Sequence, residues 1–310
     1  MKRLYTLLPA MCLVLTAFLS TPAPAYVQSQ PTINLGFTSF MDGGPPAGPG
    51  FYYTGYGLYY TADKLVDHPV PALQDADVDV WAYINQFIYQ SDQPLLFGGK
   101  WGLNFILPIV SFDSTPDLDN GCGVGDLWVG PFLQWDPIMG PNGPRFVHRI
   151  ELQNLIPIGQ YDNDAPLNAG SNFYSFNPYW AGTYWFTPRL TASYRLHYLW
   201  NAKNSDPFVG VAANDTQAGQ AVHTNFSLSY DVMPKQLRVG LNGYYLKQVT
   251  DTKLNGTDVP DSREQVLGIG PGAMYSFSQD THLFFNAYFE TSVENRPEGQ
   301  KFILRFVHHF

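Results

Sequence analysis

Charged residues are scarce in this chain of 310 residues: Asp, Glu, Lys and Arg make up 14% of it, against about 25% in an average soluble domain. The formal net charge of −9 argues against nucleic acid as a partner, because nucleic-acid-binding proteins present basic surfaces. No stretch after residue 25 reaches the roughly 20 apolar residues that a spanning helix needs. Aromatic residues, in contrast, are abundant: 22 Phe, 20 Tyr and 7 Trp exclude a disordered chain.

The first 25 residues have the pattern of a secretory signal peptide. Lys2 and Arg3 form a basic start, residues 7–19 form a mostly apolar core, and Ala23-Pro24-Ala25 is an A-x-A cleavage site. An uncleaved anchor helix is the alternative, but the apolar run is too short to span a bilayer well. After cleavage Cys122 is the one cysteine left, which excludes an intrachain disulfide.

Alternation of apolar and polar residues, the mark of a half-buried strand, recurs along the rest of the chain. In 221–232, Val222 and Leu228 fall on one face, whereas His223, Asn225 and Ser227 fall on the other. Such tracts are longer than the five or six residues typical of globular strands and suit tilted membrane strands. We count twelve tracts, centred near residues 55, 83, 103, 130, 151, 179, 194, 227, 243, 270, 286 and 304.

The connections between these tracts alternate between short and long. Outer-membrane barrels combine short periplasmic turns with longer external loops and an even strand number. In a soluble β-sandwich, nothing requires loop lengths to alternate so regularly. The sequence therefore predicts an all-β, transmembrane antiparallel barrel of about 12 strands in a Gram-negative-type outer membrane, with both termini periplasmic. The short turns are predicted near 92–94, 137–144, 186–188, 233–235 and 278–280, and the long loops at 62–76, 111–123, 159–170, 201–220, 250–263 and 292–299.

We divide the chain into a signal peptide (1–25), an N-terminal segment (26–48) and the barrel (49–310). The sequence leaves open whether the N-terminal segment is a periplasmic tail or an inward plug. Gly268, Gly270 and Gly272 share one parity of a strand, and we expect them to face inwards and leave room for a plug or packed side chains.

The last tract ends on Phe310, which shares its parity with Leu304 and Phe306. This ending resembles the C-terminal signature by which the outer-membrane assembly machinery recognises its clients. We therefore predict that Phe310 is an assembly signal.

Several short motifs, in their order along the chain, resemble a family of outer-membrane proteins called the MetA-pathway of phenol degradation family. The resemblance implies a barrel and an uptake role for hydrophobic or aromatic compounds. The motifs are Gly44-Pro45-Pro46-Ala47-Gly48-Pro49-Gly50, Tyr59-Tyr60-Thr61-Ala62-Asp63, Gly123-Val124-Gly125-Asp126-Leu127, Leu155-Ile156-Pro157-Ile158-Gly159-Gln160-Tyr161, Asn168-Ala169-Gly170-Ser171-Asn172, Gln217-Ala218-Gly219-Gln220 and Glu294-Asn295-Arg296-Pro297-Glu298-Gly299.

Nothing in the sequence predicts catalysis, because the motifs H-E-x-x-H, G-x-S-x-G, G-x-x-x-x-G-K-[ST] and C-x-x-C are all missing. We expect no enzyme, no cofactor and no metal. The inward parity mixes charges with aromatics, and the charges either line a path for a solute or pair across neighbouring strands. The candidate lumen residues are Trp81, Tyr83, Trp128, Arg149, Glu151, Arg195, Arg238, Tyr244, Tyr288, Glu290 and Arg305, together with Phe87.

The predicted function is an outer-membrane channel or transporter for small hydrophobic or aromatic compounds. The alternative is a closed structural or adhesive barrel that acts through its external loops. The predicted partners are outer-membrane lipid, the assembly machinery and a small-molecule solute.

Overall fold

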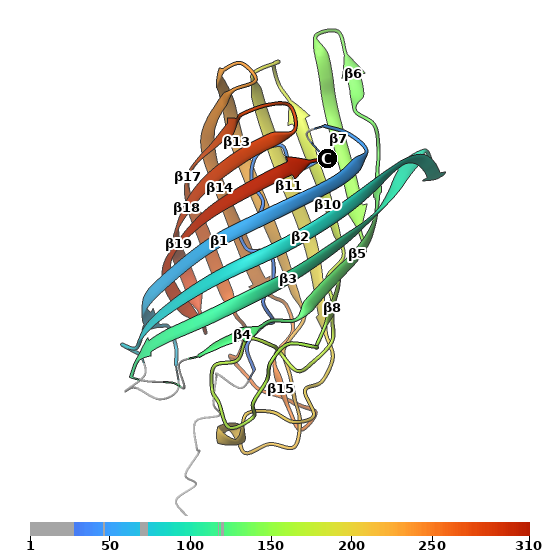
Figure 1. The fold of residues 1–310 in the computed structure, drawn as a ribbon. Coiled ribbons are helices and arrows are strands. Elements are labelled where there is room, and N and C mark those ends of the chain that lie inside the picture. Colours follow the sequence, from blue (N-terminus) through green and yellow to red (C-terminus); the bar gives the residue numbers. More distant parts are fainter. Residues whose placement is uncertain (1–27, 46, 69–73, 117, 119–120) are drawn as a thin grey trace, which may run out of the picture.

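The computed structural model describes residues 28–45, 47–68, 74–116, 118 and 121–310. In this part of the chain, twelve antiparallel strands follow one another around a barrel (Figure 1). β1 pairs with β2 on one side and with β19 on the other, which closes the sheet. The twelve are β1 (Gly50–Leu65), β2 (Asp77–Leu96), β3 (Gly99–Thr115), β5 (Leu127–Gln134), β7 (Gly143–Glu151), β10 (Tyr179–Trp185), β11 (Leu190–Asn201), β13 (Ala221–Met233), β14 (Leu237–Gln248), β17 (Gln265–Ser276), β18 (Thr281–Glu294) and β19 (Pro297–His309).

Shorter elements extend the barrel at its two ends. At the end with the long loops, three short strands pair with the wall and three more form a separate small sheet. Among the described residues, no helix has both the length and the apolar character needed to span a membrane. The short elements are β4 (Cys122–Val124), β6 (Ile138–Gly140), β8 (Asn154–Ile156), β9 (Ser175–Phe176), β12 (Thr216–Gln217), β15 (Lys253–Leu254), β16 (Thr257–Asp258) and the 3₁₀ turn η2 (Val209–Val211).

The twelve predicted tracts correspond in order to the twelve strands, which confirms the predicted fold class. One of the predicted short turns lies elsewhere. Instead of turning near 92–94, β2 continues to Leu96 and the chain reverses through Phe97 and Gly98. Both of these residues have positive φ, 51° and 76°, as in the two-residue turns whose twist matches that of a hairpin.

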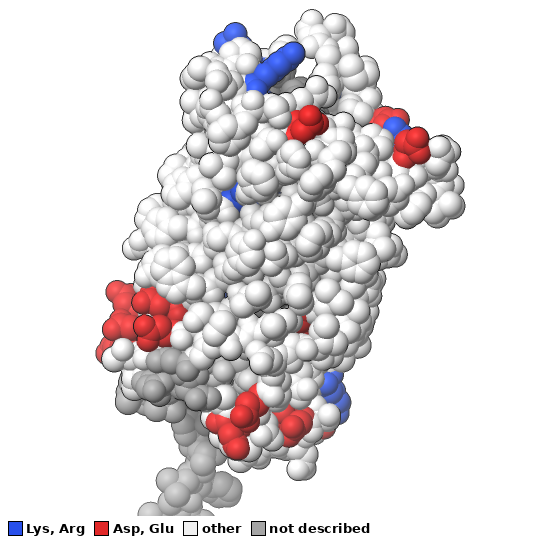
Figure 2. All heavy atoms as spheres, viewed as in Figure 1, with Lys and Arg blue, Asp and Glu red and all other residues white. Residues whose placement is uncertain are grey.

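The alternation predicted for 221–232 is found in β13. His223, Asn225 and Ser227 are buried inside the barrel, whereas Val222 and Leu228 are exposed on its outer face. In Figure 2, charged side chains gather towards the two ends of the visible face, and the band between them is nearly free of charge. Such an apolar band is the surface that an outer-membrane barrel presents to lipid.

The segment before the barrel, described at residues 28–45 and 47–49, runs lengthwise through the barrel interior (Figure 1). At the long-loop end, the side-chain oxygen of Gln28 accepts a hydrogen bond from the hydroxyl of Thr216 (2.7 Å). Towards the short-turn end, the N–H of Gly43 donates to Thr183 Oγ1 (2.8 Å). Gln28, the first described residue, therefore lies at the end opposite Phe310, and the predicted periplasmic position of the mature N-terminus lies outside the described residues.

β2 is the strand for which the predicted inward face is wrong. Trp81, Tyr83 and Phe87 were expected in the lumen, but they are 58%, 51% and 56% exposed on the outer face. Ile84 is one of the residues of β2 that pack inwards, and it lies in one cluster with Leu35 of the segment. Because the inner wall here packs against apolar segment residues and not against water, both faces of β2 are apolar and their parity is not readable from the sequence.

Candidate functional site

Backbone groups of the N-terminal segment are held by inward side chains from different strands. The N–H of Gly36 donates to Asn225 Oδ1 (2.9 Å), and the Gly36 carbonyl accepts from the Tyr288 hydroxyl (2.8 Å). Lys301 Nζ donates to the carbonyl of Leu35 (3.2 Å). The shape of the lumen therefore depends on how this segment lies within it.

Gly36 allows a close approach between the segment and the wall. It has a φ of +85°, and a Cβ at this position would lie 2.8 Å from the Tyr288 ring. We expect Gly36→Ala to weaken docking of the segment by more than about 1 kcal/mol, because a positive φ and a steric clash act together. Protease cleavage of the segment in the folded barrel measures this effect.

Gly48→Ala is the matched control for this prediction. Gly48 also has a positive φ, +93°, but a Cβ there would meet nothing within 4 Å. The control therefore retains the conformational cost and lacks the clash. Equal cleavage rates in the two variants would contradict a role for the Tyr288 contact.

An apolar cavity of about 260 Å³ lies between the segment and the inner wall of β1, β2 and β3, towards the long-loop end. Ile33, Leu58 and Ile84 are among the apolar side chains that line it, and Tyr60 and Lys301 add polar groups. Transfer of a small apolar molecule from water into this cavity would lower its free energy.

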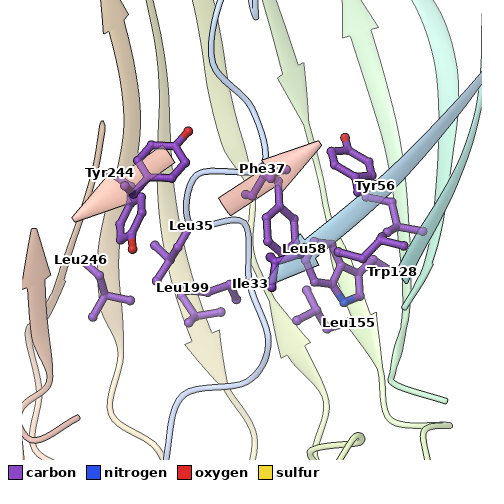
Figure 3. Close-up of a cluster of buried hydrophobic side chains, with 14 of the residues drawn as sticks. Ile33, Leu35, Phe37, Tyr56, Leu58, Trp128, Leu155, Leu199, Tyr244 and Leu246 are labelled. Carbon is purple, nitrogen blue, oxygen red and sulfur yellow. The ribbon is translucent and has the colours of Figure 1, made fainter. Parts of the chain in front are cut away.

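Three aromatic rings narrow the lumen next to this cavity (Figure 3). Phe37 of the segment stacks on Trp128 of β5, with ring centroids 6.0 Å apart and planes 5° apart. Tyr56 of β1 also lies next to Phe37, at a centroid distance of 5.9 Å. We call Phe37, Trp128 and Tyr56 the aromatic constriction.

Beyond the constriction, a cavity of about 100 Å³ is lined by Arg149 of β7, Arg195 of β11 and Arg305 of β19. We call it the arginine cavity. Arg195 donates through Nε and Nη2 to the two carboxylate oxygens of Asp42 (2.8 and 2.6 Å). The guanidinium of Arg149 lies over the Phe132 ring and also donates from Nε to a side-chain oxygen.

A wider vestibule of about 710 Å³ follows at the short-turn end. Its lining shares Met41, Gly44 and Pro45 with the lining of the arginine cavity, so the two spaces adjoin. Trp135 and Trp185 give this vestibule aromatic surface. The hollows therefore follow one another along the segment from one end of the barrel to the other.

Two buried acids are held by tyrosine hydroxyls. Glu151 accepts from Tyr179 (2.5 Å) and from the Asn104 amide (3.0 Å). Glu290 accepts from Tyr60 (2.8 Å) and Tyr244 (2.6 Å). These hydrogen bonds join side chains from different strands, so the two acids brace the inner wall.

Nine of the predicted lumen residues have side chains buried inside the barrel. Arg238 follows the expected pairing between neighbouring strands, at 3.7 Å from Asp231 of β13. Arg195, in contrast, pairs with the segment and not with a strand. The buried nine are Trp128, Arg149, Glu151, Arg195, Arg238, Tyr244, Tyr288, Glu290 and Arg305.

That the nine buried lumen residues contact a solute stays a prediction, as does recognition of Phe310 by the assembly machinery. Phe310 is 76% exposed at the short-turn end, where its N–H donates to the Phe51 carbonyl.

The expected inward position of Gly268, Gly270 and Gly272 agrees with the structure. A Cβ on Gly272 would meet Asn242 Oδ1 at 2.2 Å and Phe40 of the segment at 3.0 Å.

Sequence reasoning missed Phe37, Asp42 and Tyr56, which narrow the lumen or pair with its charges. One signal was available, since Ile33, Leu35 and Phe37 alternate with polar or small residues as a half-buried extended segment does. Among the described residues, no group of three His, Cys, Asp or Glu side chains could hold a metal ion.

The family model described as "Putative MetA-pathway of phenol degradation" matches residues 62–306. Among solved structures, the COG4313 outer membrane channel from Pseudomonas putida F1 is 18% identical over 87% of this chain and 98% of that chain, with a TM-score of 0.75. The translocator domain of autotransporter NalP from Neisseria meningitidis is 9% identical over 85% and 89%, with a TM-score of 0.47. No curated protein matches the sequence. The family and the fold agree with the prediction of a channel and not of an enzyme.

Proposed function

Because the chain belongs to the family of the MetA pathway of phenol degradation and has the fold of an outer membrane channel, we propose that small hydrophobic or aromatic compounds cross it passively. The observation that supports this most is the row of hollows along the segment. An apolar cavity, the aromatic constriction, the arginine cavity and the vestibule lie in that order. A solute enters at the long-loop end, which is the external end in outer-membrane barrels.

In this proposal, residues 26–48 act as a plug that narrows the lumen, and not as a periplasmic tail. Support comes from the described residues 28–45 and 47–48, whose backbone is anchored to the wall at Gly36 and Gly43. The signal peptide at 1–25 lies outside the described residues and stays a prediction. A plug that leaves 260 Å³ beside it on one side restricts passage to small molecules.

Single-channel recording of the refolded protein in a planar bilayer tests the channel function. We expect a small, steady conductance that phenol, used as a probe, reduces by occupying the apolar cavity. Liposome swelling measures solute flux in the same preparation. A heat-modifiable, folded barrel with no conductance and no flux above empty vesicles would contradict the proposal and favour the closed structural or adhesive barrel.

The orientation is tested by the exposed, free thiol of Cys122 at the long-loop end. We expect a membrane-impermeant maleimide to label Cys122 on intact cells, because the long loops face outwards in this proposal. The matched control is Lys235→Cys in a Cys122→Ser background, since residue 235 lies in the short turn between β13 and β14. Labelling of residue 235 but not of residue 122 on intact cells would reverse the orientation.

A further inference from the structure

Three guanidinium groups from three different strands converge on the arginine cavity. Arg149, Arg195 and Arg305 are 7%, 6% and 7% exposed, and Asp42 is the acid among the lining residues. Three cations and one anion leave this lining with a formal charge of +2. The excess is notable because the whole chain has a net charge of −9.

Asp42 forms an ion pair with Arg195, whereas neither Arg149 nor Arg305 forms an ion pair with a described residue. Among the described residues, the ion pair within 4 Å that involves this trio is the one between Arg195 and Asp42. Arg305 Nε has no hydrogen-bond partner, and its Nη1 reaches the Phe37 carbonyl only at 3.5 Å. Arginine cannot lose its proton in a protein, so among the described residues two buried cations have no ion-pair partner within 4 Å.

Aromatic rings hold these two arginines in place without neutralising them. The guanidinium of Arg149 lies 4.0 Å from the Phe132 centroid, and that of Arg305 lies 3.7 Å from the Phe284 centroid. A ring on the flat face of a guanidinium leaves the in-plane N–H groups free to bind an anion. Planar carboxylates match this donor geometry in a bidentate manner.

The volumes point to how such a ligand lies. The arginine cavity, at about 100 Å³, is smaller than the cavity of about 150 Å³ that holds benzene in a protein core, so it accepts a carboxylate but not a whole aromatic acid. The adjoining vestibule of about 710 Å³ has room for the ring and offers Trp135 and Trp185.

We propose that the arginine cavity binds the carboxylate of small aromatic acids, so that the channel selects these anions over neutral aromatic molecules of the same size. This inference rests on the proposed channel function for its physiological meaning. It concerns a binding site, however, and can therefore be tested without conductance.

Equilibrium binding to the purified protein in lipid nanodiscs, followed by titration calorimetry, tests the site. The probes are benzoate, benzyl alcohol and benzylamine, which share a ring and differ in charge. We expect benzoate to bind about ten-fold or more tightly than benzyl alcohol, because its hydrogen bonds are charge-assisted. Benzylamine is expected to bind most weakly.

The double variant Arg149→Gln/Arg305→Gln is expected to bind benzoate and benzyl alcohol equally. Arg145→Gln, which removes an exposed arginine from the same strand as Arg149, is the control and should leave the preference unchanged. If the double variant fails to fold, the binding affinities of the three probes for the wild-type protein still test the site. Equal affinities for benzoate and benzyl alcohol would overturn it.

The outcomes separate this inference from the channel function. Benzoate binding without conductance would support the site and contradict the channel. Conductance with equal binding of benzoate and benzyl alcohol would support the channel and overturn the site. A preference for benzoate that the double variant retains would also overturn it, because the two arginines would then not be the ligands.

Discussion

Replacing Phe37 by alanine is expected to raise the single-channel conductance several-fold. The Phe37 ring is the part of the segment that closes the gap to the wall, where it faces Trp128 and Tyr56. Its removal joins the apolar cavity of about 260 Å³ to the arginine cavity of about 100 Å³. Solute flux in liposome swelling should rise in parallel.

The same substitution also removes buried apolar contacts, and this effect needs a separate control. Truncation of a buried Phe to Ala costs about 3–5 kcal/mol and of a buried Ile about 2–5 kcal/mol. Ile33→Ala loses similar packing in the same segment but leaves the aromatic constriction intact. A rise of equal size in both variants would indicate that the segment has been released as a whole and that Phe37 is not the constriction.

Replacing Asp42 by asparagine is expected to destabilise the folded protein by about 3–5 kcal/mol, because it leaves a buried guanidinium without its partner. The side chains of Arg195 and Asp42 are 8% and 7% exposed, and their closest atoms lie 2.6 Å apart. Unfolding in urea measures the loss, and protease cleavage of residues 28–49 shows whether the segment comes free first. The double variant Asp42→Asn/Arg195→Gln should recover part of the loss.

Asp136→Asn is the matched control for the buried pair. Asp136 pairs with Lys100 at the same closest distance of 2.6 Å, but its side chain is 72% exposed. A surface pair contributes about 0–1 kcal/mol, so this variant should unfold almost as the wild type does. If Asp42→Asn costs no more than the control, water must hydrate Arg195 inside the lumen, and the lumen would be wetter than its burial indicates.

The Asp42 pair and the Phe37 constriction have the same consequence for how the barrel works. In the proposed channel, both features place the permeation path at the boundary between the segment and the wall, and not at the centre of an open pore. The segment is held there by hydrogen bonds to Asn225, Tyr288 and Thr183. Substitutions of Asn225, Tyr288 or Thr183 should therefore change the conductance, because they shift the segment within the lumen.

The sequence by itself determined the twelve strands, their order and the alternation of short turns with long loops. The physical reason is local, because lipid requires apolar side chains on every second residue of a membrane strand. In β13 and β11 the opposite face is polar, with residues such as His223 and Arg195 buried inside, so the alternation is clear. The lumen positions of Trp128, Tyr244 and Glu290 follow from the same parity.

Only the tertiary structure decided the path of residues 28–45 and 47–49, the inward face of β2 and the partner of Arg195. Asp42 and Arg195 are 153 residues apart in the chain, and no local pattern links them. The inner wall of β2 packs Ile84 against the apolar segment, which removes the contrast between its faces and left Trp81 and Tyr83 misplaced. Alternation of apolar and polar residues shows which face of a strand meets lipid and which meets water. It is absent where lipid lies on one side and an apolar plug on the other, because both faces are then apolar.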